Sequence, residues 1–268
     1  VQDLAEHCRF EEVAYLILNG ELPNAAQLKE FNAAESSQRA ISEDAIAVLR
    51  RFPPRAHPMD TLRTGVSFLG LEDPETADNS EAANHRKAIR LLAKIPTLVA
   101  NDFRIRKGME PIAPRADLGF AENFFQMCFG SVPEPEVVKA FDISLTLYAE
   151  HSFNASTFTA RVVASTLADL YSATVAGIGA LKGPLHGGAN EAVMHMMLEI
   201  GDPAKARDWM LDALATLPPS GARPIFERLS YPGAAPAVLG DAMAIAATID
   251  APHARTLANS LAFTGAAD

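Results

Sequence analysis

The sequence contains little cysteine and no long apolar run. Among its 268 residues only Cys8 and Cys128 are cysteines, and they form no Cys-x-x-Cys pair, which argues against a disulfide framework or a zinc site. We expect both to be reduced, partly buried thiols. No stretch of 18 apolar residues occurs, so neither a membrane-spanning helix nor a membrane partner is expected. The segment from Val1 to His7 shows no basic region followed by an apolar one, so we expect no signal peptide and a cytoplasmic location.

Basic residues are also scarce. The chain has 23 Lys and Arg against 33 Asp and Glu, a formal net charge of −10, and the basic residues form no cluster, so nucleic acid is not an expected partner. Strand signals are nearly absent, because β-branched and aromatic residues do not alternate with polar ones over a useful length. What the sequence does have is a 49% share of hydrophobic residues, enough for the core of one large domain or two modest ones.

Apolar residues recur at helical spacing along most of the chain, which predicts an all-α fold with many helices. The first helix should end at Asn19-Gly20, a typical C-cap. Pro96 lies inside an apolar stretch and should kink or end its helix, because proline has no backbone N–H to donate there. A composition shift at 217–221 is the one candidate boundary. The predicted helices cover residues 10–18, 25–39, 43–51, 59–69, 80–99, 118–129, 135–150, 156–181, 190–200, 204–214 and 236–248.

Two of the seven histidines stand out because each lies just before a predicted helix. His151 precedes the stretch that begins at 156, and His186 precedes the stretch that begins at 190. The positive end of a helix dipole favours the neutral form of a nearby imidazole. A neutral imidazole can donate a hydrogen bond to a carbonyl that is becoming an enolate. The remaining histidines in polar or loop-like settings are expected to be solvated or structural: His7, His57, His85 and His253.

Glycine surrounds the second of these histidines. Gly187-Gly188 would let a substrate approach the backbone closely beside His186, and Pro184 would stiffen the turn that presents the ring. The alternative interpretation is a glycine-rich turn with an incidental histidine. Residue types alone leave both open.

Phosphate and metal sites are disfavoured in this region. A phosphate loop over 177–183 fails because Lys182 precedes the last glycine, no Ser or Thr follows it, and no strand leads into it. His186 and His195 are nine residues apart, which places them on opposite faces of one helix, so they cannot form a metal pair. No metal-ligand set is predicted.

The distance between the two histidines depends on the helix between them. If residues 156–181 formed one straight helix, His151 and His186 would lie about 40 Å apart at 1.5 Å per residue, too far for one small-molecule site. The segment 165–169 contains Ser, Thr and Asp, which can cap a new helix start. We therefore expect two antiparallel helices that return the chain and bring the histidines together.

The residues around both histidines resemble a known family. Segment 150–161, Glu-His-Ser-Phe-Asn-Ala-Ser-Thr-Phe-Thr-Ala-Arg, and segment 178–191, Ile-Gly-Ala-Leu-Lys-Gly-Pro-Leu-His-Gly-Gly-Ala-Asn-Glu, resemble the two histidine motifs of the citrate synthase family, which includes the 2-methylcitrate synthases. Segments 3–15, 57–64 and 87–97 support the resemblance, which extends from Val1 to about Ala215. Because both motifs are specific, they favour a functional His186 over an incidental one.

The resemblance implies a citrate synthase-like homodimer. A large helical domain over 1–185 would carry the dimer face and His151, and a smaller domain over 186–268 would be divergent or incomplete after about 215. The implied reaction condenses acetyl-CoA or propionyl-CoA with oxaloacetate to give citrate or 2-methylcitrate and CoA, without a cofactor or metal. His186 would be catalytic and stabilise the enol or enolate, whereas His151 would bind oxaloacetate. In the family, an aspartate takes the α-proton and a second histidine polarises the oxaloacetate carbonyl.

The sequence departs from the family pattern after Ala215. It contains no counterpart of the family's glycine-bracketed histidine segment or of its Asn-x-Asp-Phe segment. The nearest alignments place Arg228 or, less closely, His253 at the histidine and Ala262 at the aspartate. Two explanations stay open: a truncated, degenerate relative, or a chain that is not the whole polypeptide. The alternative function is therefore a non-catalytic paralogue that keeps the dicarboxylate pocket and dimer face for binding or regulation.

The implied substrates are anionic although the chain is acidic, so local cations must offset the overall field. Arg161 lies seven residues from Asn154, close to two helical turns, which is consistent with a shared face; a surface ion pair is the open alternative. The choice between acetyl-CoA and propionyl-CoA depends on about one methylene, roughly 1–3 kcal/mol, and the sequence does not place that pocket. The candidate cations are Arg161, Lys182, Arg223 and Arg228.

Overall fold

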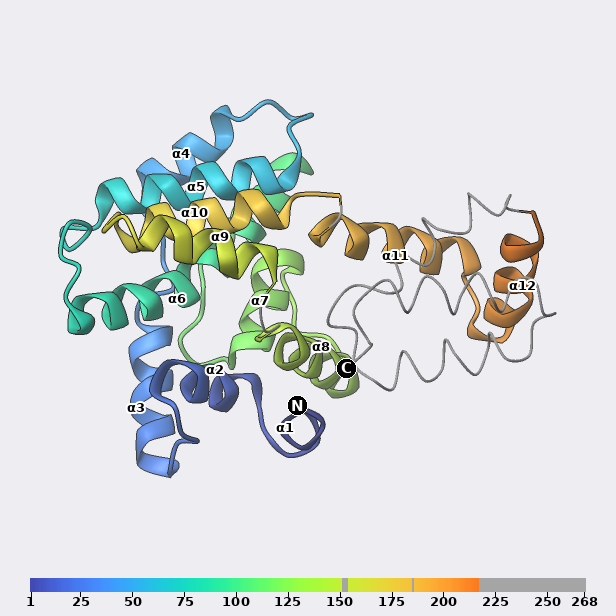
Figure 1. The fold of residues 1–268 in the computed structure, drawn as a ribbon, viewed down its shortest axis with the longest axis horizontal. Coiled ribbons are helices and arrows are strands. Elements are labelled where there is room, and N and C mark those ends of the chain that lie inside the picture. The colour runs from blue at the N-terminus through green and yellow to red at the C-terminus, as the bar shows by residue number, and fades with distance from the viewer. Residues whose placement is uncertain (151–153, 185, 217–268) are drawn as a thin grey trace. The chain divides into compact units, whose positions relative to one another are not determined.

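The computed structural model describes residues 1–150, 154–184 and 186–216, and these residues form helices and no strand (Figure 1). The all-α prediction is therefore confirmed. The chain divides between Gly179 and Ala180 into two units, which are described separately. The elements are α1 (Gln2–His7), α2 (Phe10–Asn19), α3 (Ala25–Ser36), α4 (Glu43–Arg51), α5 (Pro58–Glu72), α6 (Glu81–Arg106), α7 (Phe120–Phe129), α8 (Pro135–Tyr148), α9 (Ala155–Ala164), α10 (Leu170–Leu181), α11 (Gly187–Ile200), the 3-10 helix η1 (Pro203–Lys205) and α12 (Ala206–Thr216).

Helix boundaries follow the capping residues of the sequence. The predicted end of α2 is confirmed: Gly20 adopts the left-handed conformation, with φ of 84°, and its N–H donates to the carbonyl of Leu16. Helix α4 has the predicted bounds, because the hydroxyl of Ser42 accepts the N–H of Ala45 at its start. The predicted helix over 236–248 and the composition shift at 217–221 lie outside the described residues.

Two features of the fold differ from the prediction. Helix α1 had no clear periodic signal and was not predicted. The helix predicted over 80–99 continues to Arg106, ten residues beyond Pro96, so of the two expected outcomes, a kink or an end, the helix does not end at this proline. Proline removes one backbone hydrogen bond, a cost of about 3 kcal/mol in an isolated helix. Buried Leu91 and Leu98 lie on either side of Pro96 in α6, so packing holds the helix together across the missing bond.

The core of the first unit brings together helices that are far apart in sequence. Residues of α4, α5, α6 and α10 form the main cluster, and Phe10, Phe31 and Phe120 join α2, α3 and α7 in a second one. Each fully buried large apolar side chain contributes about 1.5–3 kcal/mol to stability. The main cluster consists of Leu49, Val66, Leu69, Leu91, Leu98, Tyr171 and Ile178.

A buried lysine closes the connection between α5 and α6. Lys87 has no exposed surface, and its ammonium group donates to the carbonyls of Asp78 at 2.6 Å and Thr76 at 3.3 Å. These bonds satisfy loop carbonyls that would otherwise be buried without partners. They therefore fix the loop that carries Glu75 and Asp73, and the Asp73 carboxylate accepts a hydrogen bond from Tyr171 of α10.

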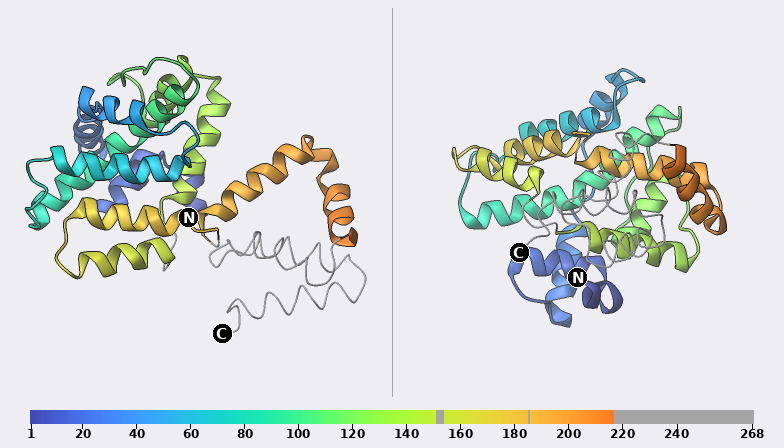
Figure 2. Two further views of the ribbon diagram at one scale, coloured as in Figure 1. Left: turned by 90° about the horizontal axis from the view of Figure 1, so that it is seen from above. Right: turned by 45° about the vertical axis from the view of Figure 1, so that its right-hand side comes forward.

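The predicted break between residues 156 and 181 is confirmed. Helix α9 ends at Ala164, Leu167 adopts a positive φ of 63°, and α10 begins at Leu170. A Cβ placed on Gly177 would lie 3.5 Å from the Ser156 carbonyl oxygen, so the end of α10 approaches the start of α9. The two helices are thus antiparallel and in contact (Figures 1 and 2).

The described part of the second unit consists of the end of α10, α11, η1 and α12. Gly201 ends α11 with a φ of 67°, and the indole N–H of Trp209 donates to the Glu199 carboxylate at 3.3 Å. Of the described helices in either unit, none is long and apolar enough to cross a membrane.

Candidate active site

His186 lies in a tight turn directly before α11, as the sequence predicts. Its backbone N–H donates to the carbonyl of Gly183 at 2.9 Å, and the N–H of Gly188 donates to the same oxygen at 3.2 Å. The side chain is half-buried, and the helix begins at the next residue, Gly187. The turn thus holds the imidazole at the positive end of the α11 dipole.

The structure shows why the first residue after His186 must be a glycine. A Cβ on Gly187 would lie 2.4 Å from the carbonyl oxygen of Leu181, closer than any real contact allows. At Gly188 the same test gives 3.2 Å to the Gly183 oxygen, a tight contact. The sequence interpretation assigned these glycines to substrate approach. In the structure, the backbone of the turn itself occupies the space beside Gly187.

His151 lies outside the described residues, which resume at Asn154. Asn154 caps α9: its side-chain oxygen accepts the backbone N–H of Thr157 and the hydroxyl of Ser156, each at 2.7 Å. The segment that follows His151 therefore has a fixed helix start. The approach of His151 to His186 stays a prediction, as does the role of each ring.

The α9–α10 hairpin is anchored to α5 and α6 by polar contacts that sequence reasoning missed. The hydroxyl of Tyr171 donates to the Asp73 carboxylate at 2.5 Å, and Arg90 donates to the same carboxylate at 2.8 Å. Arg90 also pairs with Glu75 at 2.6 Å. The amide of Asn79 donates to the carbonyl of Leu167 in the hairpin turn at 2.8 Å. The sequence signal that could have indicated this anchor is a pair of arginines one helical turn apart, Arg86 and Arg90, that follows an Asp-x-Glu segment.

The electrostatics of this anchor favour its charged and hydrogen-bonded form. Burial acts to raise the pKa of Asp73, but the Tyr171 hydroxyl and Arg90 outweigh it and hold that pKa below its usual range. Burial, together with the bond to Asp73, raises the pKa of Tyr171. Hydrogen bonds from Arg86 and Arg90 lower the pKa of Glu75 to about 2. The anchor is therefore fully ionised, with a neutral tyrosine, at neutral pH.

The hairpin also packs closely against α5. A Cβ on Gly70 would lie 2.9 Å from the Cβ of Tyr171, so only glycine lets α10 come this near. Tyr171 is itself 3% exposed. The position of α10, which leads the chain toward the His186 turn, thus depends on both packing and the polar anchor.

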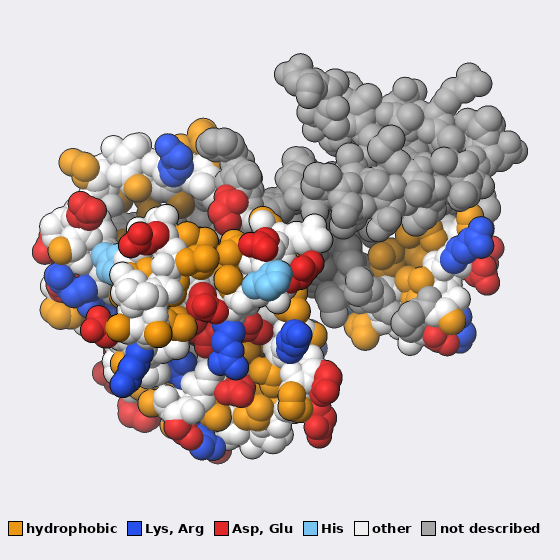
Figure 3. Space-filling model, turned by 90° about the horizontal axis from the view of Figure 1, so that it is seen from below, with side chains coloured by type: hydrophobic (Ala, Val, Ile, Leu, Met, Phe, Trp, Pro, Cys, Tyr) orange, Lys and Arg blue, Asp and Glu red, His pale blue; other side chains and the backbone are white. Residues whose placement is uncertain are grey.

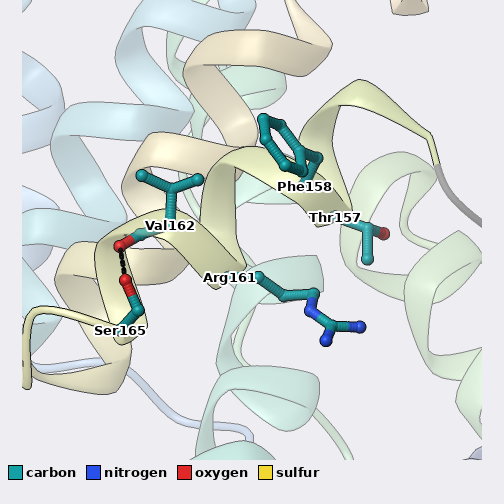
Figure 4. Close-up of a pocket in the computed structure, with 5 residues that line it drawn as sticks. All are labelled: Thr157, Phe158, Arg161, Val162 and Ser165. Atoms are coloured by element: carbon teal, nitrogen blue, oxygen red, sulfur yellow. Dashed lines mark hydrogen bonds between the residues drawn. The ribbon is translucent and has the colours of Figure 1, made fainter.

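The outer face of α9 borders a cavity of about 440 Å³ (Figure 4). Phe158 and Val162 are 68% and 49% exposed there, and in Figure 4 the Arg161 side chain extends from α9 in a different direction from these two. In the described part of the chain, Arg161 forms no ion pair, so it is available to an anionic or acidic partner. The described lining residues are Thr157, Phe158, Arg161, Val162 and Ser165.

Some of the other candidate cations and histidines lie in the described part of the chain, and others lie outside it. Lys182 lies half-buried directly before Gly183, whereas Arg223, Arg228 and His253 lie outside the described residues. His57 has the structural role expected of it, because its ring accepts the backbone N–H of Met59 at the start of α5.

The described residues contain no group of three or more His, Cys, Asp or Glu side chains arranged to hold a metal ion. Cys8 and Cys128 are both free thiols. Burial raises the pKa of Cys128 to about 11, so this thiol stays protonated and is a poor nucleophile.

Comparisons with known proteins agree on one family. The model of the citrate synthase C-terminal domain matches residues 1–218. The 2-methylcitrate synthase of Mycobacterium tuberculosis H37Rv is 56% identical over 215 residues, which cover 80% of this chain and 54% of that protein. The citrate synthase of Mycolicibacterium smegmatis is 57% identical over 210 residues, covering 78% and 56%. The chain thus spans about half the length of the curated relatives it matches.

Solved structures give the same result. The citrate synthase of Pyrobaculum aerophilum has a TM-score of 0.75 and 34% identity, covering all of this chain and 69% of its own. The citrate synthase of Thermoplasma acidophilum, determined as a ternary complex with carboxymethyl coenzyme A and oxaloacetate, has a TM-score of 0.72 and 25% identity, covering 98% of this chain and 70% of its own.

Proposed function

Because this chain belongs to the citrate synthase family, we propose that its protein condenses an acyl-CoA with oxaloacetate to give citrate or 2-methylcitrate and free CoA. The observation that supports this most strongly is His186 in a glycine-rich turn at the start of α11. Such a ring is suited to donate a hydrogen bond to an oxygen that gains negative charge.

In the proposed mechanism, His186 donates a hydrogen bond to the thioester carbonyl oxygen as a base removes the α-proton. The resulting enol or enolate carbon attacks the ketone carbon of oxaloacetate, which His151 would hold by a hydrogen bond. Hydrolysis of the thioester then releases CoA. The reaction needs no cofactor or metal, since the CoA thioester is itself a substrate. The base is an aspartate in the family, and no motif of this sequence supplies it.

We propose two candidates for the acyl-CoA substrate, acetyl-CoA and propionyl-CoA. The relatives with 56% and 57% identity are named 2-methylcitrate synthase and citrate synthase, so similarity favours neither propionyl-CoA nor acetyl-CoA. The two substrates differ by one methylene, worth about 1–3 kcal/mol in a shaped pocket. We therefore propose that both be assayed on one sample.

We also propose that the protein is a homodimer that uses the outer face of α9. Phe158 and Val162 lie one turn apart on that face and are 68% and 49% exposed, so two large apolar side chains are uncovered next to each other. A second copy would cover them. Gel filtration with light scattering should give twice the chain mass, and Phe158→Glu with Val162→Glu should give the monomer.

The test of the activity is the release of CoA from acetyl-CoA or propionyl-CoA in the presence of oxaloacetate. His186→Ala should lower kcat by about 10²–10³-fold, the usual effect of removing one such donor. His195→Ala is the matched control, because His195 is exposed on the same helix. Equal losses in both variants would contradict the proposed role of His186.

The second candidate is a non-catalytic paralogue, the alternative that the sequence leaves open because it contains no Asn-x-Asp-Phe segment; no comparison supports it. It predicts oxaloacetate binding without CoA release from either acyl-CoA. Calorimetric titration with oxaloacetate on the assayed sample distinguishes the two functions.

A further inference from the structure

A second cavity, of about 480 Å³, lies within the first unit, and none of its lining residues belongs to α9 or α10. It is bordered by the α1–α2 connection, the N-terminus of α7 and one face of α8. Its volume is in the range of small-molecule sites. Figure 3 views the molecule from the side on which Figure 1 places α1–α3, and charged side chains lie there among hydrophobic ones.

Glu11 contributes a buried carboxylate to this cavity. The side chain belongs to a residue that is only 8% exposed. Its Oε1 accepts the backbone N–H of Phe120 at 2.9 Å, which caps α7, but the buried Oε2 has no hydrogen-bond partner. An ionised oxygen buried without a donor is costly, about 1–3 kcal/mol or more. The structure therefore leaves one strong acceptor in the cavity unsatisfied.

Asp142 brings a second carboxylate to the same cavity from α8. Its Oδ2 accepts the backbone N–H of Phe10 at 3.1 Å, at the start of α2. Burial raises the pKa of Asp142, and repulsion from the Glu11 charge raises it further. The two carboxylates thus act on each other, and a positive group between them would relieve both the repulsion and the missing hydrogen bond.

The cationic residues of the cavity do not fill this role. Arg9 and Lys139 are exposed at its rim. The Arg9 charge acts to lower the pKa of Asp142, but in the described structure neither Arg9 nor Lys139 forms an ion pair with Glu11 or Asp142. Metal coordination is also disfavoured, since the described residues offer no cluster of three metal-binding side chains here. The remaining walls are largely apolar, with Phe120, Val138 and Ile143 among them.

We propose that this cavity binds a small organic cation, an alkylammonium or alkylguanidinium group. Its charged head would donate hydrogen bonds to the free Oε2 of Glu11 and to Asp142, and its apolar part would lie against Val138 and Ile143. The test of this site measures binding and not turnover, so its outcome does not depend on the proposed condensation reaction.

The test is an amide NMR titration of the full chain with n-butylammonium at neutral pH, with n-butanol as the neutral probe of equal size. The ammonium should saturate, and butanol should bind at least about tenfold more weakly, the effect of losing a charge-assisted hydrogen bond. Glu11→Gln should weaken ammonium binding by a similar factor. Its amide oxygen can still cap α7 at Phe120.

The control is Glu6→Gln, which removes the same charge at the exposed rim of the cavity and should change affinity less than about threefold. Asp142→Asn provides a second variant if Glu11→Gln unfolds, and it should also weaken binding. Absence of saturable binding to the folded wild type would overturn the proposal. Equal affinity for butanol, or an equal loss in Glu6→Gln, would overturn it as well.

Discussion

Leu98 and His186 lie in segments that keep their shape by different means. Around Leu98, in the first unit, side chains from α4, α5, α6 and α10 form a closed apolar cluster. Around His186, backbone hydrogen bonds to Gly183 and the lack of a side chain at Gly187 define the turn. No side chain described between residues 180 and 216 is buried. This comparison indicates that stability and the proposed chemistry depend on different residues.

The largest expected effect on stability is that of Leu98→Ala. Leu98 is 2% exposed, and its methyl groups lie against Gly65 of α5. The substitution should lower the free energy of unfolding by about 2–5 kcal/mol in urea denaturation, because it removes buried surface and leaves a cavity. Leu198→Ala is the control from the second unit: Leu198 is 73% exposed, and we expect less than about 0.5 kcal/mol. Similar losses in both would remove the distinction between the two regions.

A glycine substitution in the His186 turn should lower turnover, whereas Leu98→Ala lowers stability. Gly187→Ala must displace the backbone, since its Cβ would lie 2.4 Å from the Leu181 oxygen. We expect kcat for CoA release to fall by about 10–100-fold as the His186 ring moves, because displacements near 1 Å have such effects. Gly179→Ala is the control in α10, where the new Cβ would meet only Arg63 at 4.0 Å. Unchanged turnover in Gly187→Ala would show that the turn does not set the position of the ring.

The hairpin anchor should contribute moderately to stability. Tyr171→Phe keeps the packing against Gly70 but removes the hydroxyl that donates to Asp73. We expect a loss of about 1.5–3 kcal/mol in urea denaturation, the usual value for a hydrogen bond to a charged group. Tyr15→Phe is the matched control, because Tyr15 packs edge-on against Phe31 and its hydroxyl forms no hydrogen bond in the described part of the chain. If both variants unfolded alike, the Asp73 contact would have no energetic role.

Much of the first unit could be predicted from local sequence. Capping residues such as Ser42 and Gly20 define helix ends through bonds to neighbours three or four residues away, so their effect is visible in the letters. The fate of Pro96 and the burial of Lys87 could not be predicted, because they depend on tertiary packing. The Tyr171–Asp73 contact joins residues 98 positions apart, which no local pattern reveals.

The candidate site was predicted only in part. His186 and its helix follow from a local motif, and the structure places the ring directly before α11. The need for glycine at 187 could be suspected from the sequence, but its physical reason, the Leu181 carbonyl, required the backbone geometry. The place of His151 beside His186 depends on how the two units assemble and stays a prediction.

The smallest expected effect is a pH dependence of the anchor. Hydrogen bonds from Arg86 and Arg90 lower the folded-state pKa of Glu75 from 4.5 to about 2. The stability supplied by this carboxylate is therefore present above about pH 4.5 and is lost as the pH falls toward 2. The difference in unfolding free energy between wild type and Glu75→Gln should shrink over that range. Glu30→Gln, at an exposed position of α3, should show no such change.

The most direct test of the account combines turnover and stability for one variant, His186→Asn. CoA release and the urea unfolding curve should be measured on the same samples of wild type and variant. We predict a kcat lower by about 10²–10³-fold, together with a change in unfolding free energy below about 1 kcal/mol, which is too small to account for the lost turnover. A clear shift of the unfolding midpoint, with turnover reduced only in proportion to the unfolded fraction, would contradict the account.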